Sequence, residues 1–404
     1  MTEKLPSSLE KVAPPSRYEQ EQTHLTDLLA QTEHDIDTYH NAVLPLVEQR
    51  LLPEKGFNPA GVLADQLYDV DYDQDLIFEA LNTRKGGNLG FGKEAETIAP
   101  NSSLGHTIFT IAQRFEFIPR EVASWPHDAF NLRLGMGDSR AEKLPRTLVE
   151  AVIVGGGKGA TNSERLHNAL EDIRRGIIDS SKIIVATCDR PVIDSDEKET
   201  LTTFQLPLAK SEFDMAVADL NYLEGTTLDP REAQSFMVPF EQRKWVKGKQ
   251  LEPAMAEGKY IETTVALSGR DVRVILVSAP FDPRRRLPGG NMAIRANTEE
   301  TFIAAKPFLA DEIGATVVIE SHDIWINAQK VIGEEVFGLN GKRVLATGPR
   351  RLDRITYDAE HGFVLNKPEA VLDEIAKTYR QLVELKMKIM TRLAYFDDSA
   401  TSES

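Results

Sequence analysis

The chain has 404 residues, of which 41% are hydrophobic, so it can form two or three globular units or one large domain with an appendage. Its 63 acidic and 47 basic residues give a formal charge of −16, which disfavours non-specific binding to nucleic acid and to an anionic membrane face. The single cysteine, Cys188, excludes an internal disulfide and a thiolate zinc cluster, which is typical of a reducing compartment.

Both ends of the chain are polar. Residues 1–22 are rich in Pro, Ser, Glu and Gln and contain no apolar run of signal-peptide length, and residues 396–404 end in DDSATSES. We predict a disordered tail at each end. No stretch approaches the roughly 18 uninterrupted apolar residues of a membrane-spanning helix, so we expect a cytoplasmic protein.

Residues 23–147 are predicted to be mostly helical. Apolar residues recur there at helical spacing, and no convincing alternating strand pattern is present. The pattern changes near residue 148, which we take as the boundary of the next domain. Examples of the helical spacing are Leu25, Leu28, Leu29 and Ile36, then Leu44, Val47 and Leu51.

Residues 148–395 are predicted to form a Rossmann-like domain. Short runs rich in Val and Ile alternate there with helical stretches, as in parallel strands that are buried on both faces and connected by helices. The predicted fold class is α/β, with a three-layer, doubly wound, mostly parallel sheet, a helical N-terminal segment and a long C-terminal helix. The expected strands are 150–154, 182–187, 272–278, 315–320 and 342–347, and the expected helices are 163–175, 298–313 and 324–337.

Two segments of this domain differ from the rest. Residues 201–259 have mixed polarity, several prolines and scattered aromatic side chains, and we predict an insertion over the site. Apolar residues then return at helical spacing between Val371 and Ile389. That spacing predicts a long amphipathic helix packed on the body of the protein.

A glycine-rich loop, GGGKGA at 155–160, follows the first predicted strand and precedes a helix. Ligands of parallel sheets bind beyond the carboxyl ends of the strands, and glycine lets the backbone approach an anion closely. The loop fits G-x-G-x-x-A but lacks the spacing of a triphosphate-binding loop, so a kinase or an ATPase is not indicated. The alternative is a plain tight turn. The predicted ligand-binding residues of the loop are Gly155, Gly156, Gly157 and Lys158.

Two charged residues close to the loop are further candidates. Arg165 lies in the first turn of the next helix, where its charge opposes the helix dipole, so we predict an anionic ligand or a carboxylate beside it. The alternative is an exposed arginine paired with an acid such as Glu199. Asp189 follows the second strand, where dinucleotide-binding folds place an acid on the ribose, or it caps a turn. Cys188 is expected to be a buried small apolar residue.

Polar residues also follow the later strands. The segment 279–290 holds three consecutive arginines and two glycines, and 348–351 adds two arginines. The arginines of both segments could bind an anion, or they could be charged side chains exposed to solvent. Asn297, Thr298 and Glu300 open a helix, where they fit ligand contacts or an ordinary helix cap.

The segment Glu320-Ser321-His322-Asp323 ends the strand TVVIE and supplies acid, base and acceptor groups. We predict that Glu320 and His322 are catalytic, with His322 transferring a proton, and that Ser321 contacts the ligand. The alternative is that Ser321 and Asp323 cap a helix and His322 lies on the surface. The other histidines show no metal-ligand spacing, so no metal site is predicted.

Several motifs of residues 148–350 occur in the same order in a known family. They are AVIVGGG, Arg165-Leu166, KIIVATC, Glu197 or Glu199, Asn297-Thr298-Glu299-Glu300 and Ile319-Glu320-Ser321. In these motifs the chain resembles the YdcF/SanA-type family of domains of unknown function, although Ile324 and Asn327 stand where the family has His and Arg. The resemblance implies a Rossmann-like fold with a polar pocket at the strand ends and, from one branch, binding of S-adenosylmethionine.

Three functional hypotheses remain open. The first is a small-molecule-binding protein, catalytic or not, whose ligand is S-adenosylmethionine or another nucleotide-like anionic or zwitterionic molecule. In this hypothesis the amides of Gly155 to Gly157 bind the negative part, and Asp189, Glu300 and Glu320 accept hydrogen bonds. The second is an NAD-dependent oxidoreductase. The third is a non-catalytic scaffold that binds a partner protein through its helical N-terminal region. No nucleic-acid or membrane partner is expected, and the oligomeric state stays open.

Overall fold

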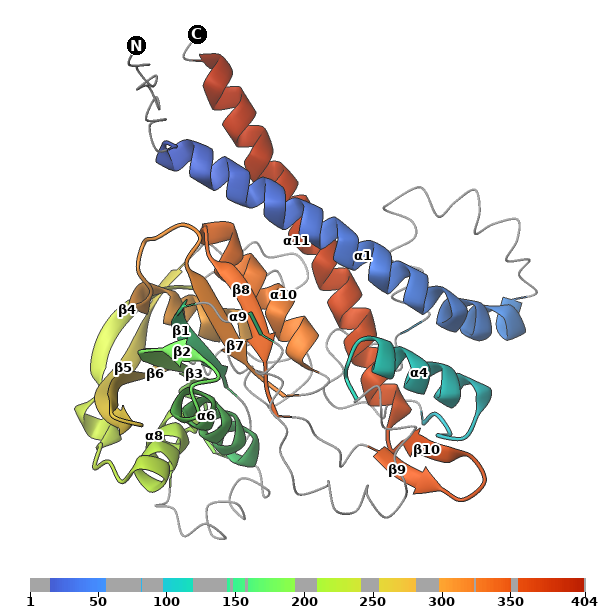
Figure 1. Ribbon diagram of the computed structural model, residues 1–404, viewed down its shortest axis with the longest axis horizontal. Helices are drawn as coiled ribbons and strands as arrows, with labels where there is room; N and C mark the ends of the chain where they lie inside the picture. Colours follow the sequence, from blue (N-terminus) through green and yellow to red (C-terminus); the bar gives the residue numbers. More distant parts are fainter. Residues whose placement is uncertain are drawn as a thin grey trace, which may run out of the picture.

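The computed structural model shows an α/β part built on one large sheet, with a helical body beside it (Figure 1). The predicted α/β fold class is therefore confirmed. Among the residues described, no helix combines the length and the apolar character needed to cross a membrane. The structure describes residues 15–55, 81, 97–118, 144–145, 148–156, 159–192, 209–240, 254–280, 298–322, 325–349 and 355–402.

The α/β part contains an eight-stranded sheet. Its strands are β1 (Leu148–Gly155), β2 (Asp179–Ser180), β3 (Lys182–Cys188), β4 (Gln234–Phe240), β5 (Ala254–Leu267), β6 (Arg270–Ala279), β7 (Thr316–Glu320) and β8 (Arg343–Thr347). They lie in the order β4-β5-β6-β3-β1-β7-β8, and β2 pairs with β1. The neighbours from β6 to β8 are parallel, whereas β4 and β5 add an antiparallel edge. The predicted strands are all present, and their continuous apolar runs follow from burial on both faces.

The strand order defines where a ligand would bind. The chain passes from β1 outward to β3 and β6, and then returns to β7 and β8 on the other side of β1. This is the doubly wound order of a Rossmann-like sheet, and the direction of winding reverses between β1 and β7. The crevice at such a switch point, beyond the carboxyl ends of the strands, is the usual ligand site of this architecture.

Helices cover both faces of the sheet. Helices α6 (Gly159–Arg174) and α8 (Glu212–Glu224) share one apolar core with the sheet, into which Val154 points. Helices α9 (Thr298–Ala305) and α10 (Ile326–Val336) form the core of the opposite face, which contains Ile153, the residue before Val154. The two faces alternate along each strand because successive side chains point to opposite sides.

Two of the predicted helices end at other residues than expected. The helix predicted over 298–313 stops at Ala305, and a 3-10 turn, η4 (Lys306–Phe308), follows. Pro307 lies in that turn, and a proline in a helix interior removes a hydrogen bond and clashes with the preceding turn. The helix predicted over 324–337 corresponds to α10, which ends at Val336. Gly338 then opens the 3-10 turn η6 (Gly338–Asn340), and the glycine in the left-handed conformation is Gly341, with φ +87°.

The predicted insertion, residues 201–259, is in its described part an integral portion of the sheet layer. It supplies α8 on one face and the edge strands β4 and β5. Its mixed polarity has a physical reason, because β4 is the edge strand and most of its described side chains are exposed. The described part of the segment therefore widens the sheet, and residues 201–208 and 241–253 lie outside the described residues.

The helical body consists of α1 (Arg17–Lys55), α4 (Ser103–Arg114) and α11 (Pro368–Ser402), together with the hairpin of β9 (Ile355–Asp358) and β10 (Gly362–Leu365). Helices α1 and α11 cross in close contact (Figure 1). Both run into segments that we predicted as tails. The Tyr18 hydroxyl donates to the Phe396 carbonyl at 2.6 Å, and their rings pack edge to face. These contacts hold the two helix ends together.

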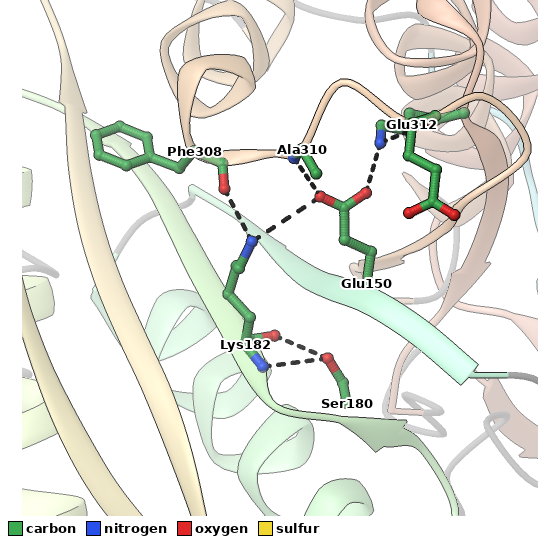
Figure 2. A network of polar contacts seen from close by, with 7 residues as sticks. Glu150, Ser180, Lys182, Phe308, Ala310 and Glu312 are labelled. Carbon is green, nitrogen blue, oxygen red and sulfur yellow. Dashed lines mark hydrogen bonds and ion pairs between the residues drawn. The ribbon is translucent and has the colours of Figure 1, made fainter.

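A network of charged groups joins the amino ends of the central strands. Figure 2 shows Glu150 of β1 between the amide of Ala310 and the ammonium group of Lys182. Lys182 also donates to the Phe308 carbonyl at 3.0 Å. Lys342, just before β8, donates to Glu150 at 2.6 Å. The network ties β1, β3, β8 and the turn after α9 together at the edge opposite the switch point.

Candidate functional site

Two segments predicted from the sequence meet at the switch point. Gly155 ends β1, and Glu320 ends the neighbouring strand β7. The two strands pair in parallel, with Val154 opposite Glu320. Ser321 and His322 follow Glu320 directly and are buried. The glycine loop and the Glu-Ser-His segment thus begin side by side at the carboxyl edge of the sheet.

Arg165 of α6 links these two strand ends. Its Nη1 donates to the carbonyl oxygens of Gly155 at 2.7 Å and Gly156 at 3.0 Å. Its Nε donates to Nδ1 of His322 at 2.9 Å. The side chain is only 3% exposed, so the alternative of an exposed arginine is wrong. Arg165 holds the imidazole and the first part of the glycine loop in a fixed relation to each other.

Glu320 lies on the side of the sheet that α6 covers. The Asn168 amide donates to Glu320 at 2.7 Å and to Asp172 at 3.2 Å. Burial raises the pKa of the Glu320 carboxyl well above its usual value, and the nearby Asp172 charge raises it further. The Asn168 hydrogen bond and the Arg165 charge oppose this rise in pKa. A carboxyl with a raised pKa retains its proton at higher pH and fits the predicted role of an acid.

Several buried polar atoms at this edge have no hydrogen-bond partner among the described residues. Buried polar groups in folded proteins are almost always paired, so such a group needs a specific explanation, of which a bound ligand is one. They belong to α6, to the end of β7, to α10 and to the end of β8. The atoms are Asn162 Oδ1 and Nδ2, Glu320 Oε2, Ser321 Oγ, Gln329 Oε1 and Thr347 Oγ1.

Close packing explains the second glycine of the loop. A Cβ atom on Gly156 would lie 2.6 Å from the Ala186 carbonyl and 2.8 Å from Oε1 of Glu212. This position therefore requires glycine before any ligand is considered. A Cβ atom on Gly155 would lie 2.7 Å from Oε1 of Gln329, which is the end of a flexible side chain and can move aside. Gly157 and Lys158 lie outside the described residues, as does Glu199.

At the end of β3, the predicted site residues have partners within the protein. Asp189 forms an ion pair with Lys259 at 2.6 Å. The Cys188 thiol is buried and donates to Glu212 at 3.2 Å, and Glu212 also pairs with Arg190 at 3.0 Å. Burial raises the pKa of the Cys188 thiol, which makes a thiolate nucleophile unfavourable. The prediction that Cys188 is a buried residue is confirmed.

The predicted residues that open α9 belong to the helix layer opposite to α6. Glu300 is buried in the first turn of α9, beside Thr298. Helix α9 packs on the face of the sheet opposite to α6, whereas Glu320 contacts α6. The carboxyl groups of Glu300 and Glu320 thus belong to different faces. The predicted Asn297, Asp323 and the arginines of 284–286 and 350–351 lie outside the described residues.

Several residues of this edge, Asn162 among them, were not predicted. Asn168 follows Arg165 by three residues, so its helical spacing could have placed it on the same face. Gln329 and Thr347 carry no comparable signal in the sequence. Trp325 packs edge-on against His322, with ring centroids 4.7 Å apart, and hydrogen-bonds to Glu374 of α11. The helical body therefore contacts the site through Trp325.

A pocket of about 240 Å³ lies between the helical body and the first turn of α10. Beside it, Asn327 donates to the Tyr39 hydroxyl at 3.1 Å and to the Phe115 carbonyl at 3.3 Å. Tyr39 of α1 and Phe115 stack with ring centroids 4.0 Å apart. The helical body thus forms one wall of this pocket, and α10, which begins shortly after His322 in the sequence, contributes to another. Its lining residues are Arg114, Phe115, Glu116, Leu144, Ile326, Asn327 and Ala346.

Within the described ranges, no three His, Cys, Asp or Glu side chains are grouped as a metal site would require. Comparisons of the chain with protein-family models, with curated proteins and with solved structures find no match. The function must therefore be argued from the geometry of the switch point.

Proposed function

We propose that the protein binds a small nucleotide-like molecule, anionic or zwitterionic, at the switch point between β1 and β7. The observation that supports this most directly is the group of buried polar atoms without partners at the ends of β7 and β8 and in the helices beside them. Doubly wound sheets bind their ligands at this edge, so the unpaired atoms lie where the architecture provides a site.

The residues of this edge suggest how the ligand is held. The loop after Gly156 leads into α6, whose N-terminus is oriented toward the crevice and favours the negative part of a ligand. The hydroxyl groups of Ser321 and Thr347 supply hydrogen bonds from the ends of the neighbouring strands. The resemblance to the YdcF/SanA-type family makes S-adenosylmethionine the first ligand to test, and Glu320 is the candidate for acid chemistry at this edge.

NAD is the second candidate ligand, because Asp189 follows β3 at the position where Rossmann-like folds contact the ribose. Its ion pair with Lys259 disfavours that role, since the ribose hydroxyl would have to displace Lys259 from the Asp189 carboxylate or bind beside it. The same binding experiment separates these two ligands from the scaffold hypothesis. In the scaffold hypothesis neither molecule binds.

Replacing Ser321 with Ala is expected to weaken ligand binding by about tenfold, which corresponds to one lost hydrogen bond of about 1.4 kcal/mol. The fold should keep its stability, because the Ser321 hydroxyl has no partner among the described residues. Isothermal titration of the full chain with S-adenosylmethionine, and separately with NAD, measures the effect. Native mass spectrometry of gently purified protein gives an independent view of any bound metabolite.

Ser278→Ala is the matched control. Ser278 is also a buried serine near the carboxyl end of a strand, but it lies in β6, away from the switch point, and its hydroxyl contacts the adjacent Ala279 carbonyl. It should leave binding unchanged. Equal affinity of wild type and Ser321→Ala, or equal losses in both variants, would contradict a ligand at this crevice.

A further inference from the structure

The contact between Arg165 and His322 fixes the chemical state of the imidazole. We infer that His322 is a neutral ring with its proton on Nε2, that Arg165 is the positioning residue that keeps it so, and that His322 binds the ligand as a hydrogen-bond donor. The last step rests on the proposed function, whereas the state of the ring does not.

The tautomer follows from the donor inventory of arginine. A guanidinium group has only N–H donors and remains protonated in proteins, so any atom it contacts at hydrogen-bond distance must accept. The atom 2.9 Å from Nε of Arg165 is Nδ1 of His322. Nδ1 must therefore present its lone pair, and the proton of the neutral ring is on Nε2.

A doubly protonated ring is incompatible with this contact. A proton on Nδ1 would point at the N–H of Arg165 and place two positive groups next to each other. Both side chains are buried, with His322 1% and Arg165 3% exposed, so water would screen this repulsion poorly. Two carboxyl groups lie near this pair: Glu320, which interacts with Arg165, and Glu374, which accepts from Trp325. Burial raises the pKa of both, and each favours a positive charge on Arg165 or on the ring only when it is ionised. Neither changes which partner of the pair must accept.

This state determines what His322 can do. An imidazole with Nε2–H donates a hydrogen bond and cannot accept a proton at the same nitrogen, so His322 does not act as a base while Arg165 holds it. The ligand atom that it contacts must be an acceptor, such as a carbonyl, carboxylate or phosphate oxygen. The predicted role in proton transfer is thereby replaced by recognition of an oxygen.

The tautomer can be measured without a ligand. Long-range ¹H–¹⁵N correlation spectra of the ¹⁵N-labelled full chain distinguish protonated from unprotonated ring nitrogens, and His322→Gln identifies the signals of His322. At pH 7.5 we expect Nε2 to be protonated and Nδ1 to be unprotonated. His106 is an internal control with the opposite pattern, because its Nδ1 lies 2.9 Å from the Ser102 carbonyl, which can only accept.

A wild-type spectrum with the His322 proton on Nδ1, or with a charged ring, would overturn the inference. In Arg165→Met the constraint is removed, so the His322 ring should exchange between both tautomers or become protonated, while His106 stays unchanged. An unchanged His322 pattern in a folded Arg165→Met variant would show that Arg165 does not set the tautomer. If that variant does not fold, the wild-type spectrum still decides the state of the ring.

Adding S-adenosylmethionine, and in a separate sample NAD, tests the donor role. Binding should shift the Nε2–H resonance of His322 and leave the ring neutral. A bound ligand that leaves this resonance in place, or that moves the proton to Nδ1, would overturn the donor role. If neither molecule binds, the proposal of these two ligands fails, while the tautomer result stands by itself.

Discussion

Asp219→Asn is expected to stabilise the protein increasingly as the pH rises from about 4 to 7, with a gain approaching about 4 kcal/mol above pH 7. Asp219 of α8 is buried against α6, and burial raises its pKa from 3.8 to about 7. A hydrogen bond with Ser163 lowers the pKa, but burial has the larger effect. Between pH 3.8 and about 7, Asp219 therefore keeps its proton in the folded state and has lost it in the unfolded state. Wild-type stability falls across this window because the buried carboxyl must ionise, whereas the amide of Asn stays neutral.

Urea unfolding of both proteins at pH 5, 6, 7 and 8 measures this difference. Asp271→Asn is the control, since Asp271 is exposed near the start of β6 and its substitution should change the stability far less than that of the buried Asp219. Glu320 also has a raised pKa, so it too lowers the stability of the folded protein as the pH rises. This contribution is the same in variant and wild type and cancels in the comparison. A stability gain that does not grow with pH would show that Asp219 is stably ionised in the folded protein.

The parallel part of the sheet could be predicted from the sequence because its strands are buried on both faces. The apolar runs that end in Gly155 and Glu320 have few polar interruptions, and each precedes a helix. The antiparallel edge was not predicted, since β4 exposes most of its described side chains and contains Pro239 near its end. An edge strand needs neither two apolar faces nor a complete set of amide donors, so its composition resembles that of a loop.

The site could be predicted as a region but not as a set of contacts. The rule that ligands bind at carboxyl ends of parallel strands correctly brought Gly155, Ser321 and His322 to one edge. The face on which Glu320 lies depends on strand register, and a shift of one residue reverses it. The face of Glu300 depends on which side of the sheet α9 covers, so neither residue could be assigned to a face from the sequence. The inward turn of Arg165 toward His322 joins residues 157 positions apart, and no local pattern encodes it.

Glu150→Gln is expected to destabilise the protein by about 3–5 kcal/mol, because it removes the carboxylate that pairs with both Lys182 and Lys342. The side chain of Lys342 is 5% exposed and that of Glu150 12%, so little water can replace the lost partner. Gln can still accept from the Ala310 amide, but its NH2 group then faces Lys342, so the variant removes both the negative charge and an acceptor for that lysine. Burial already lowers the pKa of Lys182, and the loss of the Glu150 charge should lower it further.

A second substitution and a surface control separate the lost pair from a general effect of mutation. Adding Lys342→Met to Glu150→Gln removes the unpaired ammonium group, and the double variant should regain most of the stability, as urea unfolding will show. Asp179→Asn disrupts a pair with Arg270 at the same end of the sheet, with side chains 64% and 45% exposed, and should cost less than about 1 kcal/mol. If Glu150→Gln costs no more than Asp179→Asn, the network does not hold the strand ends together. If the double variant is no more stable than Glu150→Gln, the unpaired lysine is not the cause of the loss.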